Sequence, residues 1–377
     1  MITGRWRHAL LLALAMACAG LAPQALGAPT VRVLLAEGLD AVDVRVDGAH
    51  EVRSPRGRAR TDFALAWPLR AADGEVATAE RHAGAWVELH PEAGTVRFGG
   101  RSYRGALRIE AAGGGLRVVN LVGLEAYLRG VVPAEMKALW PVEALKAQAV
   151  AARSYTLAQL DPAAPWDVCA SDACQVYSGI QAEHPRSDRA VRDTEGIVIS
   201  YGGAPAVAYY HADSGGVVAS SAEVWGRALP YLVSRTDVDA ASPHRGWTVT
   251  LEPAALARAL AEEGRTVGTP TSLAVTRHGP SRRAAAAVVT GSAGKIVLDG
   301  RVLTRVLRAA GLRSTQIVSL GGLRVRGDGW GHGVGMSQYG ARALAQAGHD
   351  YGQILAFYYP GVGLQRRVYR AADATSP

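Results

Sequence analysis

The sequence predicts an α+β protein in which a β-rich N-terminal lobe precedes a lobe that mixes helices and strands. Apolar and polar residues alternate between residues 31 and 109, with glycine-rich turns between the runs, as expected for half-buried strands. Apolar residues then recur at helical spacing between residues 124 and 156. With 377 residues, 49% of them hydrophobic and 20% charged, the chain is globular and long enough to bury a sizeable core.

The first 27 residues resemble a secretory signal peptide. Two arginines precede an apolar run at residues 9–18, and Ala25-Leu-Gly27 resembles a cleavage site. The apolar run is too short and too early for a good membrane span. Lipidation at Cys18 is a weaker alternative, because the residues before it make a poor lipoprotein signal. We therefore expect an exported, periplasmic or extracellular protein with no transmembrane segment in the mature chain.

The chain carries a formal net charge of +8, and lysine contributes to it only at positions 137, 146 and 295. Such a basic chain raises the question of nucleic acid. We expect no nucleic-acid partner, because the chain looks exported and has no run of basic residues with interleaved aromatics. An anionic polymer of the cell envelope is a better partner for this charge. Solubility alone is an equally good explanation.

Residues 28–112 form the predicted β-rich N-terminal lobe. Val42, Val44 and Val46 alternate with charged residues, and Asp47-Gly48 is typical of a tight turn. Three glycines at residues 113–115 then interrupt the pattern. The lobe contains no catalytic constellation, and we interpret it as a supporting or docking element.

Two helices are predicted next, and Glu135 lies in the bend between them. Pro133 is expected to stop the first helix, and Pro141 is well placed to begin the second. Apart from Lys137, the nearest neighbours of Glu135 are apolar. A carboxyl group in apolar surroundings is held protonated towards neutral pH, as a general acid requires. The alternative is a solvated glutamate in a turn.

Trp140 follows Glu135 closely, and its indole ring would offer a platform for a sugar ring. Residues 247–320 alternate strand-like and helix-like segments, which we interpret as a structural α/β subdomain inserted in the second lobe. Glycine then occupies every second position from Gly327 to Gly335. This run lacks the signatures of phosphate-binding loops, so it favours close packing of the backbone against a ligand or a strand. His332 within it is either a ligand or proton carrier, or a hydrogen-bonded structural histidine.

Cys169 and Cys174 are the cysteines that remain after the signal peptide. In an oxidising compartment their short spacing favours a disulfide over a metal site, because two cysteines alone cannot complete a tetrahedral zinc site. Zinc stays open as an alternative, with His184 the nearest histidine in sequence. Ser214 lies between Asp213 and two glycines, but the G-x-S-x-G signature of a serine hydrolase is absent.

A set of collinear motifs covers most of the second lobe, between Leu116 and Tyr359. The motifs are Val132-Pro-Ala-Glu-Met136, Trp140-Pro-Val-Glu-Ala-Leu-Lys-Ala-Gln-Ala-Val-Ala-Ala-Arg-Ser-Tyr155, Cys174-Gln-Val-Tyr-Ser-Gly179, Tyr210-His-Ala-Asp-Ser-Gly-Gly216, Glu223-Val-Trp-Gly226 and Gly329-Trp-Gly-His-Gly-Val-Gly-Met-Ser-Gln-Tyr-Gly340. Together they resemble the sporulation stage II protein D family, which also includes the amidase-enhancer proteins.

This resemblance implies that residues 113–370 form a catalytic region. The implied activity is that of a lytic transglycosylase, which acts on peptidoglycan glycan strands stripped of their stem peptides. The catalytic glutamate of the family maps onto Glu135. Further residues are implied to lie in the cleft and bind substrate: Arg153, Tyr155, Gln175, His211 and Ser214, to which we add Trp140 and His332.

The resemblance also leaves alternatives. Some relatives bind zinc through cysteines of this region and a histidine, but Ala173 stands where relatives often carry that histidine. We therefore expect a disulfide between Cys169 and Cys174, no metal and no cofactor. The name of the amidase-enhancer proteins implies a second function, a non-catalytic wall-binding protein that stimulates a cell-wall amidase. Sporulation itself does not follow from the resemblance.

Overall fold

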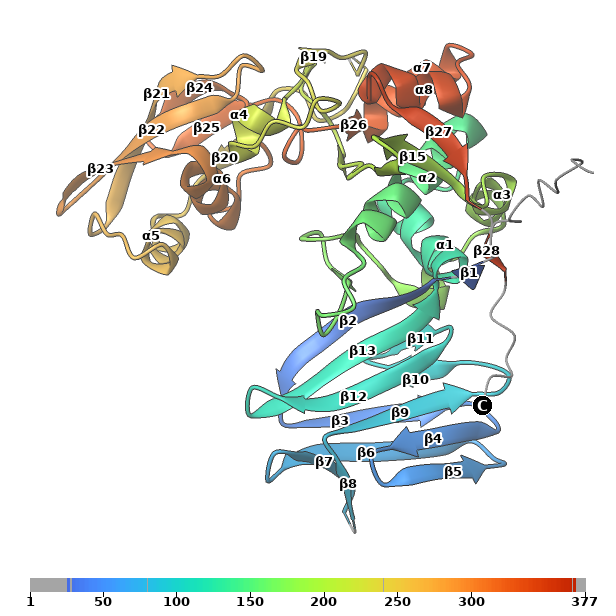
Figure 1. Ribbon diagram of the computed structural model, residues 1–377. Coiled ribbons are helices and arrows are strands. Elements are labelled where there is room, and N and C mark those ends of the chain that lie inside the picture. The colour runs from blue at the N-terminus through green and yellow to red at the C-terminus, as the bar shows by residue number, and fades with distance from the viewer. Residues whose placement is uncertain (1–25, 28, 80, 240, 368, 371–377) are drawn as a thin grey trace, which may run out of the picture.

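The computed structural model describes residues 26–27, 29–79, 81–239, 241–367 and 369–370. It has the predicted α+β fold (Figure 1). The predicted signal peptide lies outside the described residues except for β1 (Leu26–Gly27), which pairs in parallel with β28 (Tyr369–Arg370). In the described part of the chain, no helix combines the length and the apolar character that a membrane crossing requires.

Two sheets build the N-terminal lobe. The larger has the strand order β14-β2-β13-β12-β9-β4-β5, and the smaller has the order β11-β10-β3-β6-β7-β8. Their strands are β2 (Thr30–Leu39), β3 (Ala41–Val46), β4 (His50–Ser54), β5 (Gly57–Thr61), β6 (Leu65–Ala72), β7 (Glu75–Ala77), β8 (His82–Gly84), β9 (Trp86–Pro91), β10 (Val96–Phe98), β11 (Arg101–Tyr103), β12 (Ala106–Ala112), β13 (Gly115–Gly123) and β14 (Val168–Cys169). The predicted alternation is confirmed in β3, whose three valines are buried while the residues between them are exposed.

The N-terminal lobe continues beyond the boundary that the sequence suggested at residue 112. Strand β13 runs to Gly123 and leads directly into α1 (Leu124–Glu135). Buried residues of both sheets and of the following helices belong to one hydrophobic cluster, which extends from Val31 to Tyr359. The lobe therefore braces the helices through a shared core.

Helices and short strands form the second lobe around α2. They are α2 (Val142–Gln159), η1 (Gly179–Ala182), α3 (Pro185–Asp193), β15 (Ile197–Tyr201), β16 (Ala204–Pro205), β17 (Tyr210–His211), β18 (Val217–Val218), α4 (Ser221–Trp225), β19 (Arg235–Thr236), β26 (Met336–Ser337), α7 (Gln338–Gln346), α8 (Tyr351–Tyr358) and β27 (Gly363–Arg366). The small residues of α2 allow close approach, and α2 packs against α1, α3, α7 and α8. A capping box begins α8, in which Asp350 and Gln353 each bond the other's backbone.

The expected stop of α1 at Pro133 is wrong by two residues. Proline lacks the N–H that would bond to the preceding turn, but this removes a single bond near the end of the helix. The backbone N–H of Met136 donates to the carbonyl of Val132 at 2.9 Å and closes the last turn. Helix α1 therefore ends at Glu135, which is its last residue.

Residues 247–327 have a hydrophobic core of their own. The core holds residues such as Leu256, Leu303 and Val325 and is separate from the main cluster. Its elements are β20 (Trp247–Thr250), α5 (Pro253–Glu262), β21 (Pro270–His278), β22 (Ala284–Gly291), β23 (Gly294–Asp299), α6 (Gly300–Ala309), β24 (Ile317–Gly321) and β25 (Arg324–Gly327). These elements extend to one side of the helical lobe, at the upper left of Figure 1. We refer to residues 247–327 as the inserted subdomain.

Candidate active site

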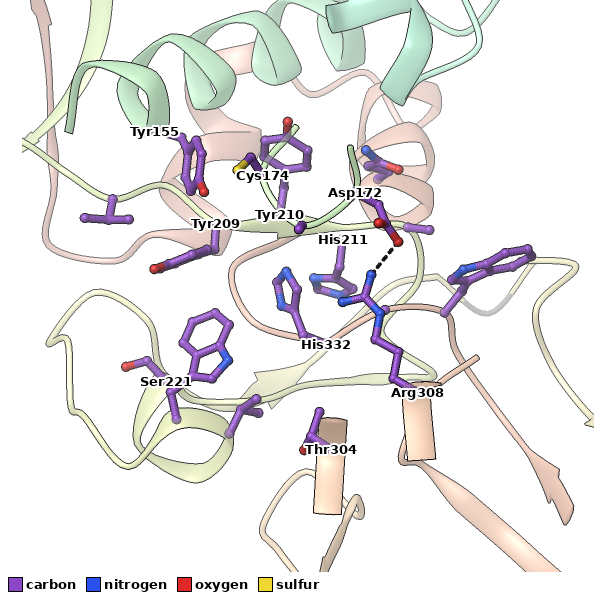
Figure 2. A pocket seen from close by; sticks show the side chains of 18 of the residues that line it. Tyr155, Asp172, Cys174, Tyr209, Tyr210, His211, Ser221, Thr304, Arg308 and His332 are labelled. Atoms are coloured by element: carbon purple, nitrogen blue, oxygen red, sulfur yellow. Dashed lines mark hydrogen bonds and ion pairs between the residues drawn. The ribbon is translucent and has the colours of Figure 1, made fainter. Parts of the chain in front are cut away.

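A cavity of about 690 Å³ lies where the helical lobe, the loop between Cys169 and Cys174, and the inserted subdomain meet (Figure 2). Glu135 enters it from the end of α1, and Tyr210 and His211 enter it from β17. Helix α6 of the inserted subdomain lines the opposite side. The cavity is therefore assembled from segments that are distant in sequence.

Hydrogen bonds hold both carboxyl oxygens of Glu135. The backbone N–H of Val176 donates to Oε1 at 2.7 Å, and the Gln338 side-chain amide donates to Oε2 at 3.2 Å. The Tyr210 hydroxyl also hydrogen-bonds this carboxyl. These three contacts come from three different segments and fix the carboxyl at the cavity wall.

Tyr210 is itself held from behind by Gln175. The Gln175 amide nitrogen donates to the Tyr210 hydroxyl at 2.9 Å, while its oxygen accepts from Tyr127 and Thr156 at 3.2 and 2.8 Å. Because the Tyr210 oxygen already accepts from Gln175, its own proton is available for Glu135. A buried hydrogen-bond network thus orients the Tyr210 hydroxyl toward the Glu135 carboxyl.

Burial is the largest influence on the acidity of Glu135, and it raises the pKa of the carboxyl above the ordinary value of 4.5. The hydrogen bonds from Val176, Gln338 and Tyr210 favour the charged form, so they oppose this rise without cancelling it. The negative charge of Asp172 adds to the rise. Burial thus favours the protonated carboxyl and the hydrogen bonds favour the carboxylate. The net result is that Glu135 keeps its proton to a higher pH than an exposed glutamate does.

The predicted disulfide between Cys169 and Cys174 is present. The loop that it closes carries Asp172, whose carboxylate pairs with the Arg308 guanidinium of α6 at 2.6 Å (Figure 2). Val176, which donates to Glu135, follows two residues after the loop. The disulfide loop therefore contacts the inserted subdomain, and the segment that directly follows the loop contacts the carboxyl.

Two histidines lie side by side in the cavity, with the rings of His211 and His332 5.5 Å apart. Burial and the charge of Arg283 lower the pKa of His332 to about 3, and burial lowers the pKa of His211 well below 6.5. Both rings are therefore neutral at physiological pH. His332 Nδ1 accepts from the Val334 N–H at 3.0 Å, while His211 Nε2 is buried and has no hydrogen-bond partner among the described residues.

The alternating glycines let the backbone pack closely beside these histidines. A Cβ at Gly331 would lie 3.0 Å from the His211 Cβ, and a Cβ at Gly335 would lie 1.9 Å from the Tyr209 carbonyl oxygen. Gly335 also has a φ of +75°, which side chains disfavour. The interpretation of the run as a site of close backbone packing fits these distances.

The structure brings together Glu135, Tyr155, His211 and His332, all of which line the cavity. Four other expected cleft residues lie outside its lining. Arg153 is fully buried, and its ion pair with Glu125 at 2.7 Å joins α2 to α1. Gln175 lies behind Tyr210, as described above.

Ser214 and Trp140 are likewise removed from the cavity. The Ser214 hydroxyl is buried and donates to Asp239 at 2.7 Å, which is the behaviour of a turn-stabilising residue. The Trp140 ring is buried against Tyr339, 4.9 Å between centroids, and therefore offers no platform for a sugar. The placement of all four residues outside the lining has one cause, since a sequence motif shows proximity to the site without showing which way a side chain points.

Sequence reasoning did not single out several residues of the cavity wall. Tyr210 lies within a quoted motif, and Gln338 within another, but neither was assigned a role. Tyr209, Trp225 and Trp330 line the cavity with aromatic surface. The described residues contain no group of three or more histidines, cysteines or acids placed to hold a metal ion.

Comparison with known proteins identifies the region around this cavity. The model of a family described as "Stage II sporulation protein" matches residues 112–201. The chain is 32% identical over 288 residues to the "Amidase enhancer" of Bacillus subtilis, a match that covers 63% of this chain and 40% of that protein. The chain thus spans less than half the length of this relative.

Two other relatives are matched over most of their length. An uncharacterized protein of Brachyspira hyodysenteriae is 33% identical over 276 residues, which cover 70% of this chain and 73% of the relative. The "Stage II sporulation protein D" of Bacillus subtilis is 31% identical over 264 residues, which cover 64% of this chain and 74% of the relative.

Proposed function

Since the chain belongs to the stage II sporulation protein D family, we propose that it is a peptidoglycan lytic transglycosylase. The proposed reaction cleaves the bond between N-acetylmuramic acid and N-acetylglucosamine in glycan strands stripped of stem peptides. It leaves 1,6-anhydro-N-acetylmuramic acid ends. The observation that carries the proposal is the setting of Glu135, a carboxyl of raised pKa that lines a large cavity and is held by three hydrogen bonds.

In the first step Glu135 acts as the acid. Its raised pKa keeps a fraction of the carboxyl protonated towards neutral pH. Oε1 accepts the short hydrogen bond from Val176, so the proton belongs on Oε2, where the contact with Gln338 is longer. Transfer of this proton to the glycosidic oxygen breaks the bond and gives the muramic acid ring oxocarbenium character.

In the second step the same carboxyl acts as the base. The carboxylate takes the proton from the C6 hydroxyl of the muramic acid, whose oxygen attacks C1 and closes the anhydro ring. No water is consumed, and one carboxyl completes both proton transfers. The donors on Glu135 stabilise the carboxylate between the two steps, while burial restores its tendency to take the proton back.

The rest of the cavity suits a glycan. Tyr209, Trp225 and Trp330 present aromatic faces against which sugar rings can pack. His211 Nε2, buried and without a partner among the described residues, is available to a hydroxyl or an acetamido group of the substrate. Because both cavity histidines are neutral, they position substrate by hydrogen bonds and do not compete with Glu135 as acids.

Asp172, the second acidic residue that lines the cavity, is poorly suited to the water activation that hydrolysis would require. Asp172 and Glu135 are the acidic residues among the described residues that line the cavity. A hydrolase needs a second carboxylate to activate water, but the Asp172 carboxylate is engaged by Arg308 at 2.6 Å. We therefore favour intramolecular ring closure over hydrolysis.

The name of the relative called "Amidase enhancer" suggests a second function. In this alternative the protein binds the wall glycan without cutting it and stimulates a cell-wall amidase. Incubation of the purified protein with amidase-stripped glycan separates the two. The transglycosylase proposal predicts new 1,6-anhydro ends by mass spectrometry, whereas intact strands that remain bound, together with a faster amidase, favour the alternative.

A further inference from the structure

Helix α6 of the inserted subdomain divides its residues between two faces. Leu303, Val306 and Leu307 are buried in the core of the inserted subdomain. Arg301, Thr304, Arg305 and Arg308 line the cavity, at the helical spacing that places side chains on one face. The inserted subdomain thus contributes a wall to the cavity that holds Glu135, beyond the structural role that its sequence suggested.

The positive charge of this wall is only partly balanced. Arg305 forms a two-pronged ion pair with Glu263, and Arg308 pairs with Asp172. Arg301 donates instead to the backbone carbonyl of Trp225, which carries no net charge. Arg227, which lines the same cavity, has no ion pair among the described residues. Among the described residues that line the cavity, two guanidinium groups are therefore uncompensated, those of Arg301 on α6 and of Arg227, which follows α4.

Arg308 already holds a carboxylate at the edge of the cavity. The Asp172 side chain reaches Arg308 across the edge of the cavity, and both side chains are largely exposed, at 75% and 52% (Figure 2). Because both side chains are exposed, a carboxylate from a ligand can reach Arg308 while Asp172 stays paired with it. Arg308 has five N–H donors in a fixed fork and uses one of them in its contact with Asp172, which leaves donors for a second acceptor.

We propose that Arg227, Arg301 and Arg308 form a carboxylate-binding subsite, which recognises the free lactyl carboxylate of a stripped muramic acid residue. The inference rests on the proposed function, because that function supplies the glycan strand in the cavity. In an intact strand the lactyl carboxyl is consumed by the amide bond to the stem peptide, so it carries no charge. Because Arg301 and Arg308 belong to the inserted subdomain, the subdomain takes part in distinguishing stripped strands from intact ones.

The test measures binding and not cleavage. The full chain carrying Glu135→Gln is titrated with fluorescently labelled stripped strands, with the same strands after conversion of their carboxylates to methyl amides, and with strands that keep their stem peptides. We expect about tenfold weaker binding of the methyl-amide and peptide-bearing strands, as for the loss of one charge-assisted hydrogen-bonded contact. The affinity for stripped strands should also fall as ionic strength rises.

Arginine variants then locate the effect. In the Glu135→Gln background, Arg227→Gln and Arg301→Gln together should weaken binding of stripped strands to the level of the methyl-amide strands. Arg258→Gln is the matched control, because Arg258 is exposed on α5 of the same subdomain and does not line the cavity. Unchanged binding of a neutral oligomer of N-acetylglucosamine shows that each variant keeps its folded cavity.

Two outcomes overturn the proposal: equal binding of stripped and methyl-amide strands, or an arginine double variant that binds stripped strands as tightly as the parent does. If peptide-bearing strands bind tightly and lose affinity once their peptide carboxylates are amidated, the arginines recognise peptide carboxylates and the lactyl assignment is overturned. The proposed function is judged separately. A wild-type protein that cuts stripped and methyl-amide strands equally well is a transglycosylase without this subsite.

Discussion

At the scale of single residues, the structure explains why one glutamate among many is suited to proton transfer. Glu125 lies on the same helix as Glu135, but it forms an ion pair with the buried Arg153. Glu135 has no cation as a partner among the described residues, and its three contacts are to an amide N–H, a side-chain amide and a hydroxyl. Burial therefore determines the direction of its pKa shift, and neutral donors moderate it.

The Tyr210 hydroxyl provides a direct test of this balance. In Tyr210→Phe the Glu135 carboxylate loses a hydrogen bond that lowers its pKa, so the pKa rises further above 4.5. Glu135 acts first as an acid and works below its pKa, so the alkaline limb of the kcat/KM profile should move to higher pH. The maximal rate should fall by roughly fivefold, which corresponds to about 1 kcal/mol for one hydrogen bond.

Tyr209→Phe is the matched control for this prediction. Tyr209 lines the same cavity, and its ring packs on Trp225 at 4.4 Å, but its hydroxyl makes no hydrogen bond with Glu135 in the described structure. The alkaline limb of the kcat/KM profile of Tyr209→Phe should therefore lie at the same pH as that of the wild type. A limb that does not move in Tyr210→Phe would show that Tyr210 does not tune Glu135.

At the scale of elements, the disulfide loop connects the acid to the inserted subdomain. Replacing Cys169 and Cys174 together by serine should lower the free energy of unfolding by about 2 kcal/mol, the entropy estimate for so short a loop. Activity should fall more than this stability loss explains at a temperature where the variant stays folded. The reason is that the loop positions both Asp172 and the segment that leads to Val176.

Thermal unfolding followed by circular dichroism, with and without a reductant, measures the first part of this prediction, and a rate assay at low temperature measures the second. The wild type in reductant should resemble the double serine variant. Full activity of a folded double variant would mean that the loop holds its conformation without the disulfide, against the role given to it here.

The glycine run offers a second prediction at this scale. The Tyr209 carbonyl oxygen accepts from the Met336 N–H at 3.1 Å and from the Tyr359 hydroxyl at 2.7 Å, and it lies where a Cβ on Gly335 would collide with it. Gly335→Ala should therefore lower the free energy of unfolding by about 2–5 kcal/mol, from backbone strain and from the collision. Denaturation in urea measures the loss.

Gly348 separates these two contributions. It also has a positive φ, +93°, but a Cβ there would meet no atom within 4 Å. Gly348→Ala should thus cost only the conformational strain, about 1–2 kcal/mol. Equal losses in the two variants would show that close packing at Gly335 contributes nothing.

At the scale of the whole molecule, the cavity that holds Glu135 depends on all three parts of the chain. The N-terminal sheet reaches the site through Asn120 on β13, whose side-chain oxygen accepts from the Tyr177 hydroxyl at 2.9 Å. Tyr177 directly follows Val176, the residue that donates to Glu135. The N-terminal lobe, which lies below the helices in Figure 1, therefore supports the segment that carries Val176, and α6 of the inserted subdomain lines the cavity.

The limits of prediction from sequence follow from this long-range assembly. Local patterns were sufficient for the valines of β3 and for the disulfide, because each depends on residues close together in the chain. The apolar neighbours of Glu135 likewise indicated its raised pKa. Gln338, however, lies 203 residues from Glu135, and Arg308 lies 136 residues from Asp172. No spacing in the sequence shows such pairs.

The central claim is that Glu135 transfers protons in both directions and that no water enters the product. The most direct test is the reaction of the protein with stripped glycan in water enriched in heavy oxygen, followed by mass spectrometry of the released fragments. We predict 1,6-anhydro ends without heavy oxygen for the wild type, and a rate about 10² to 10⁴-fold lower for Glu135→Gln. Reducing ends that carry one heavy oxygen, or unchanged activity of Glu135→Gln, would contradict the claim.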